Sequence, residues 1–153
     1  MRNTTFLSII LLFLTACGNN KADQPVADND TAAGVESTYY WEATSNDSTG
    51  NLEMKRIQRT DSISTKSIFA FINNAHPRIL LELVKTSNDT IYLKIKDATV
   101  LTQQMGSTGA MEYLAAAVYN LTELPGIKYV TLDFEEGDHA APGTYTRESF
   151  KDQ

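Results

Sequence analysis

The chain has 153 residues, a length that accommodates one domain rather than two. Hydrophobic residues make up 42% of it, the usual globular share and enough to build a core. Its formal net charge of −6 argues against binding nucleic acid or anionic lipid through a broad basic face. An electrostatically steered partner is therefore expected to be neutral or basic.

The first sixteen residues are predicted to be a lipoprotein signal peptide. The apolar run from Phe6 to Leu14 is too short to span a bilayer but has the length of a secretory signal. It ends in the sequence Leu14-Thr15-Ala16-Cys17-Gly18, which resembles a bacterial lipobox. Cleavage would follow Ala16, and the thiol of Cys17 would accept the lipid. The alternatives are a signal with an incidental cysteine and an apolar start to the domain.

Cys17 is the single cysteine, so the sequence predicts no disulfide, no cysteine nucleophile and no zinc thiolate site. Acyl groups on it would anchor the protein to a bacterial membrane, inner or outer, on the extracytoplasmic side. Residues 17–36 are polar and lack aromatic side chains, which is typical of a flexible tether. A single domain is expected over 37–153.

The first part of this domain is predicted to be a hairpin followed by a helix. Residues 37–44 and 52–60 have the composition of strands, and turn-forming residues separate them. A short helix is predicted over 65–74, with Ile68 and Ile72 on one face, and Pro77 ends the pattern.

A second hairpin is predicted over 78–95, with its turn at 87–89. Its second strand alternates Ile91, Leu93 and Ile95 with polar residues, so one face is expected to be buried and the other exposed to solvent.

A loop then leads to a second helix and a closing strand. The predicted apolar stripe of the helix is Met111, Leu114, Ala115, Val118 and Leu121 or Thr122; Glu112, Ala116 and Asn120 fall elsewhere. Pro125-Gly126 ends the helix, and 127–134 is predicted to be a buried strand. The tail is turn-rich, with a short extended piece at 144–146.

The element order is therefore β-β-α-β-β-α-β. We expect an α+β fold: a two-layer sandwich in which two helices cover one face of a mostly antiparallel sheet.

The domain resembles the GerMN domain of spore-germination and sporulation proteins over residues 37–137. The residues that carry the resemblance are Tyr39-Tyr40-Trp41, Gly50-Asn51-Leu52, Arg56, Arg59, Gly106-Ser107, the block from Asn120 to Val130, and Glu136-Gly137. The last block, from the helix end through the closing strand to the glycine, is the most specific.

The resemblance implies an extracytoplasmic, non-catalytic module, similar to the ring-building motifs that assemble or scaffold envelope machinery. The chain departs from the tandem arrangement of germination proteins by having a single copy. A role in sporulation is not carried over, and the family offers no catalytic residues to place here.

The segment Gly106-Ser107-Thr108-Gly109 opens the second helix and has two interpretations. A helix N-terminus with free N–H groups holds anions, but the spacing of a phosphate loop and a neighbouring Lys or Arg are both missing. The favoured interpretation is a helix cap, in which Ser107 or Thr108 accepts a hydrogen bond from an N–H two or three residues later.

A second cluster contains the acidic residues and histidine of the segment that follows the closing strand: Asp133, Glu135, Glu136, Asp138 and His139. These residue types hold divalent cations, but the spacing matches no calcium loop. The interpretations are a solvated turn, which is favoured, a metal site, or an acid–base pair.

Two other features are weaker. His76 precedes Pro77 and is interpreted as a helix terminus, where the dipole favours a cation. Tyr39, Tyr40 and Trp41 either fill the core or form an exposed patch for a partner or glycan.

The leading hypothesis is a lipid-anchored envelope protein that binds or scaffolds an envelope protein or the cell wall, without catalysis, cofactor, metal or nucleic acid; an oligomer is compatible with it. The rival is a cell-wall hydrolase that uses Asp133, Glu135 and His139. A third possibility is a binder of soluble ligands with an apolar pocket between helix and sheet. The alanine-rich helix argues against this pocket, because small side chains favour tight packing.

Overall fold

The structure is a computed structural model that describes residues 39–60 and 62–153. The predicted signal peptide with Ala16, the lipidation site Cys17 and the tether lie outside the described residues. Within residues 39–60 and 62–153, no helix has the length and apolar character needed to cross a membrane.

The described residues form strands, two α-helices and two short segments of other helical type. In chain order they are β1 (Tyr39–Ser45), β2 (Leu52–Gln58), α1 (Thr65–Ala75), β3 (Leu81–Ser87), β4 (Thr90–Ile95), the π-helix η1 (Val100–Gln104), α2 (Gly106–Leu121), β5 (Tyr129–Asp133), β6 (Gly143–Tyr145) and the 3₁₀-helix η2 (Arg147–Phe150). The predicted order of strands and helices is confirmed, with β6 one residue earlier than the extended piece expected in the tail.

The strands form two separate sheets. β1 pairs only with β2, and the four-stranded sheet has the order β3-β4-β5-β6. All neighbouring strands are antiparallel except β4 and β5, which run parallel because α2 lies in the connection between them. The α+β class and the mostly antiparallel pairing are therefore confirmed.

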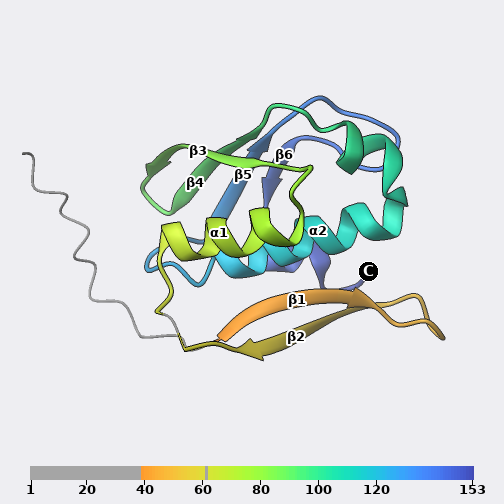
Figure 1. Cartoon of the computed structure of the whole chain (residues 1–153), viewed down its shortest axis with the longest axis horizontal. Coiled ribbons are helices and arrows are strands. Elements are labelled where there is room, and N and C mark those ends of the chain that lie inside the picture. Colours follow the sequence, from red (N-terminus) through yellow and green to blue (C-terminus); the bar gives the residue numbers. More distant parts are fainter. Residues whose placement is uncertain (1–38, 61) are drawn as a thin grey trace, which may run out of the picture. The chain divides into compact units, whose positions relative to one another are not determined.

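The helices lie between the two sheets rather than on the outside of one. Figure 1 shows α1 and α2 covered on one side by β3–β6 and on the other by the β1–β2 hairpin. The two helices do cover one face of the four-stranded sheet, as expected, and the hairpin adds a further layer that the two-layer expectation lacked. The reason is Tyr40, which is fully buried and stacks on Phe71 of α1 with ring centroids 4.7 Å apart, and so holds the hairpin against the helices.

Burial of α2 reflects this two-sided cover. Its buried residues include Leu114, Ala115, Val118 and Leu121 of the predicted stripe, but also residues outside that stripe: Ala110, Tyr113, Ala117 and Asn120. A helix that contacts sheets on both sides buries more than one stripe, and its sequence is correspondingly less amphipathic. The helix therefore contributes to two interfaces at once.

Helix α1 begins as the sequence predicts and extends one residue further. Ser64 is the N-cap, and its side chain forms a reciprocal capping box with Ser67. His76 is the C-cap, and its backbone N–H donates to Ile72 O.

The loop expected before α2 contains the π-helix η1, which was not predicted. Thr102 in η1 is buried, and its hydroxyl donates to Ala98 O. Gly137 packs directly on this turn: a Cβ added there would lie 2.6 Å from Thr102 Cβ and 3.0 Å from Thr102 O. The glycine is therefore required by close packing, because any side chain would displace η1.

Candidate functional site

The outer edge of β1 runs along one line of α2. Two-point pairing joins Asn120 to Trp41: Trp41 N–H donates to Asn120 Oδ1 at 2.9 Å, and Asn120 Nδ2 donates to Trp41 O at 2.8 Å. Four residues further along β1, Ser45 N–H donates to Glu112 Oε1 at 2.6 Å. Two polar side chains of the helix thus replace a neighbouring strand.

The spacing of the two elements makes this alignment possible. Four residues of helix rise about 6.0 Å, and two residues of strand rise about 6.8 Å. Glu112, Ala116 and Asn120, which fall outside the predicted apolar stripe, therefore lie opposite Ser45, Ala43 and Trp41 in turn.

The middle position of this row is unpaired. Because the hydrogen-bonding groups of an antiparallel ladder alternate in direction, Ala43 N–H and C=O point the same way as those of Trp41 and Ser45, away from β2. The side chain of Ala116, opposite Ala43, is a methyl group and carries no donor or acceptor. Among the described residues, no group is found hydrogen-bonded to Ala43 from the α2 side.

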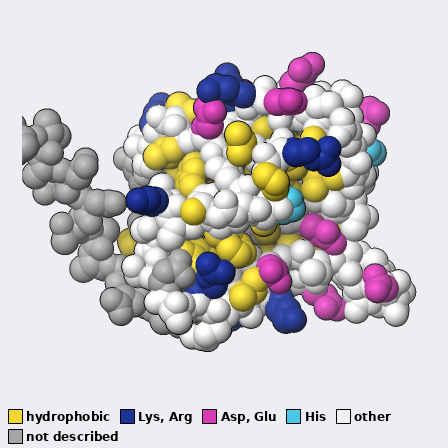
Figure 2. Space-filling view, in the orientation of Figure 1, with side chains coloured by type: hydrophobic (Ala, Val, Ile, Leu, Met, Phe, Trp, Pro, Cys, Tyr) yellow, Lys and Arg dark blue, Asp and Glu magenta, His cyan; other side chains and the backbone are white. Residues whose placement is uncertain are grey.

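A hollow of about 310 Å³ opens at this point, and we call it the recess. It is lined by Trp41, Glu42, Ala43 and Thr44 of β1; by Phe71, Ile72 and Ala75 of α1 with His76; and by Met105, Gly109, Glu112, Tyr113 and Ala116 in and before α2. Figure 2 shows hydrophobic side chains gathered along the seam between α1 and the hairpin, with a histidine and acidic side chains toward one end. The alanine-rich helix does leave a pocket, contrary to our expectation.

The charge in the recess is negative. Its described lining contains two glutamates, Glu42 and Glu112, and no Lys or Arg. His76 adds a polar group, and its ring meets that of Tyr113 edge-on at 5.0 Å. Burial lowers the pKa of His76, and the nearby Glu112 carboxylate offsets part of this effect, so the neutral imidazole is favoured near pH 7. His76 is confirmed as a helix terminus, but not as the cation expected there.

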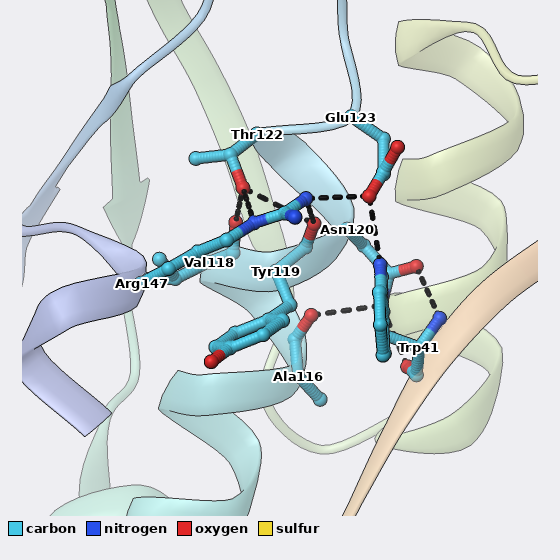
Figure 3. A network of polar contacts seen from close by, with 8 residues as sticks. All are labelled: Trp41, Ala116, Val118, Tyr119, Asn120, Thr122, Glu123 and Arg147. Atoms are coloured by element: carbon cyan, nitrogen blue, oxygen red, sulfur yellow. Dashed lines mark hydrogen bonds and ion pairs between the residues drawn. The ribbon is translucent and has the colours of Figure 1, made fainter. Parts of the chain in front are cut away.

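A cluster at the end of α2 fastens the hairpin beside the recess (Figure 3). Arg147 Nη2 lies 2.5 Å from Glu123 Oε1 and donates to Tyr119 O at 2.9 Å, and Arg147 Nε donates to Thr122 Oγ1 at 2.7 Å. The same Glu123 oxygen accepts a bond from Trp41 Nε1 at 2.8 Å. The guanidinium therefore ties η2 and α2 to the first strand, which fixes one wall of the recess.

The three aromatic residues of β1 divide between core and surface. Tyr40 is fully buried, whereas Tyr39 and Trp41 are half-buried and meet edge-on at 5.5 Å. Arg56 from β2 lies over both rings, 4.4 Å and 4.9 Å from their centroids. Both interpretations thus hold in part: Tyr40 fills the core, and the other two form a half-exposed row.

The residues Gly106-Ser107-Thr108-Gly109 do open α2, but the expected side-chain cap is wrong. The N-cap is Met105, which makes no side-chain capping bond, and Ser107 and Thr108 lie inside the first turn. The helix follows directly on η1 through Gly106, whose φ of 73° only glycine adopts readily, so its start is set by the preceding backbone. Ser107 Oγ instead lies 3.2 Å from His139 Nδ1.

The acidic segment after β5 does not converge on a site. Asp133 faces solvent, 3.6 Å from Lys94 Nζ, and Glu135, Glu136 and Asp138 are exposed. None of them lines the recess. Among the described residues, no group of three or more His, Cys, Asp or Glu is placed to hold a metal ion.

Sequence reasoning missed Asn120, Glu112 and Arg147. Helical periodicity scores apolar residues, so polar residues that pair with a strand edge leave no signal in it. The one available hint was the position of Asn120 and Glu123 within the motif that carries the GerMN resemblance.

Comparison with known proteins identifies a similar solved structure. No family model and no curated protein matches the chain. The chain is similar to the tandem GerMN domains of the sporulation protein GerM from Bacillus subtilis, at 18% sequence identity and a TM-score of 0.44. The match covers 76% of this chain and 48% of the other, so this chain spans about half of that protein's length. That protein carries GerMN domains, the domain that the present sequence resembles.

Proposed function

We propose that the protein is a lipid-anchored component of a bacterial cell envelope, whose GerMN-like domain binds or scaffolds another envelope component without catalysis. The observation that supports a lipid anchor is the position of the single cysteine, Cys17, directly after Leu14-Thr15-Ala16. The polar segment that follows has the composition of a tether that holds the domain off the membrane.

The binding role is supported by the contrast between two regions of the domain. The carboxylates of the acidic segment face solvent, whereas an acid–base pair needs two groups that face each other across a concave site. The recess, by comparison, is concave and mainly apolar, with a few polar groups, which is the usual character of a binding site.

The anchor is tested by metabolic labelling with a fatty-acid analogue in a bacterial host. The natural chain is expected to incorporate the label and to migrate as the cleaved form. Cys17→Ser removes the acceptor thiol, so label and cleavage at this position are both expected to disappear. Continued labelling of the serine variant refutes the lipid anchor.

The binding role is tested by cross-linking in cells that express the anchored chain. Recovery of one envelope protein or of cell-wall fragments, in an amount that depends on a folded domain, is the expected result. Purified protein that degrades cell-wall polymer, with activity lost in Asp133→Asn or Glu135→Gln, would instead support the hydrolase.

A further inference from the structure

The recess combines an unpaired strand edge, negative charge and apolar walls. We propose that it binds a short basic peptide segment. The C=O and N–H of one residue of the segment pair with Ala43 N–H and C=O, and a Lys or Arg side chain of the segment lies beside Glu42 and Glu112. This inference rests on the proposed binding function and names the chemistry of the partner.

The unpaired strand edge defines the first requirement. Trp41 shows what satisfies such an edge here, because the Asn120 carboxamide both accepts from its N–H and donates to its C=O. In an extended peptide, the N–H and C=O of one residue point to the same side and offer the same donor and acceptor. Addition of a peptide to an exposed strand edge is a recurring mode of recognition, in which the backbone supplies affinity.

The edge is available over one residue only. Asn120 and Glu112 already occupy Trp41 and Ser45 on either side, so a long added strand is excluded. The volume of about 310 Å³ agrees with this limit, because it lies at the lower end of the range for ligand pockets. The bound segment is therefore short, with one residue inserted between β1 and α2.

Charge defines the second requirement. Two glutamates and no Lys or Arg line the described walls, and the whole chain has a net charge of −6. One carboxylate oxygen of Glu112 accepts the Ser45 N–H, and no side chain within residues 39–60 and 62–153 donates a hydrogen bond to the other oxygen. A cationic side chain is attracted to this lining, whereas an acidic one is repelled.

The apolar walls define the third requirement. Phe71, Ile72 and Met105 line the recess, and Gly109 and Ala116 leave room above the helix backbone. An aliphatic residue beside the cation, or the methylene stem of the cation itself, removes this surface from water. A basic residue next to an apolar one is the sequence that fits all three requirements.

The test titrates the full chain, solubilised in detergent micelles, with acetyl-Leu-Lys-Leu-amide. Trp41 lines the recess and is the only tryptophan of the chain, so its fluorescence reports binding there. We expect a saturable change, and at least about 10-fold weaker binding of acetyl-Leu-Glu-Leu-amide. No saturable change up to about 5 mM, or equal affinity for both peptides, overturns the proposal.

Two variants locate the site. Ala116→Asn places a carboxamide opposite Ala43, as Asn120 is placed opposite Trp41, and is expected to weaken peptide binding at least about 10-fold. Ala70→Asn is the matched control, because Ala70 is exposed on α1 and outside the recess. Unchanged affinity in Ala116→Asn refutes pairing at Ala43.

Glu42→Gln keeps the proposal testable if Ala116→Asn fails to fold, because Glu42 is exposed and its change leaves the hairpin pairing intact. It is expected to weaken binding of the lysine peptide and leave that of the glutamate peptide unchanged or stronger. Equal affinity of natural chain and variant for the lysine peptide overturns the role of charge. Mass spectrometry of the peptide separates this inference from the function: a cleaved peptide refutes non-catalytic binding but leaves the recess a peptide site.

Discussion

The carboxamide of Asn120 pairs with both the N–H and the C=O of Trp41, 79 positions earlier in the chain. Asn120 is fully buried and also donates to Ala116 O at 2.8 Å. One side chain of α2 therefore acts as a strand for the edge of β1 and holds the hairpin against the helix layer.

Asn120→Ala is expected to lower the free energy of unfolding by about 2–3 kcal/mol, because two backbone groups of Trp41 lose their partners in a part-buried place. Urea denaturation measures the loss. Asn74→Ala is the control on the exposed surface of α1, where a change within about 0.5 kcal/mol is expected. Equal stability of the two variants contradicts the docking role of Asn120.

Gly137→Ala is expected to destabilise the domain by about 1–3 kcal/mol, because its new Cβ would lie 2.6 Å from Thr102 Cβ and crowd the backbone of η1. The matched control is Gly143→Ala, whose Cβ would first meet Tyr145 at 3.9 Å. Thermal unfolding compares the two. If Gly137→Ala is as stable as the control, η1 can shift to accommodate the added methyl group without loss of stability, which contradicts the packing requirement.

Arg147→Met is expected to lower the free energy of unfolding by about 1–3 kcal/mol, because the carboxylate of Glu123, 16% exposed, loses its cationic partner. The guanidinium also no longer holds this carboxylate in place beside Trp41 Nε1. Trp41 emission is expected to shift to longer wavelength as water reaches the indole. Lys151→Met removes a cation from an exposed, solvent-screened pair with Glu148, so it should leave stability nearly unchanged. Similar losses in both variants would contradict the structural role of Arg147.

His76 is expected to make stability depend on pH. Burial lowers its pKa below the ordinary 6.5, so the unfolded chain binds its proton more readily than the folded one. The contribution of the neutral ring is therefore complete above pH 6.5 and declines as pH falls from there toward the folded-state pKa. The charge of the nearby Glu112 carboxylate reduces the effect by favouring the cation.

Denaturation curves of the natural chain and His76→Gln between pH 7.5 and 5 measure this dependence, since the difference between them isolates His76 from the carboxylates. The gap in stability is expected to narrow or reverse as pH falls. A difference that stays constant over the range means that the folded and unfolded pKa values of His76 are the same.

Local signals in the sequence predicted most of the elements, and long-range pairing explains the rest. Ser64 with Ser67 caps α1, and Asn88, with a φ of 56°, turns the β3–β4 hairpin where turn residues were expected. No comparable local signal predicts where the β1–β2 hairpin packs. Its position against the helices depends on the contacts of Asn120 with Trp41 and of Tyr40 with Phe71, which are far apart in the chain. The recess follows from that docking, so it was not predictable either.

The start of α2 illustrates a different limit. Ser107 and Thr108 are good capping residues, which made a cap the natural expectation. The π-helix before them carries the chain directly into α2, so the helix begins three residues earlier than a Thr108 cap would place it. Local preference was overruled by the packing of Thr102 against the turn at Gly137.

In the proposed function, the anchored domain meets its partner at the recess. Site-specific photo-cross-linking in living cells tests it most directly, with the photoreactive residue at Thr44, which lines the recess, or at Glu135 in the exposed acidic segment. We predict one sequenced protein adduct at Thr44, containing a basic segment, that disappears in the Ala116→Asn background, and no adduct at Glu135. An adduct at Glu135 alone, or one at Thr44 that is indifferent to Ala116→Asn, would contradict the claim.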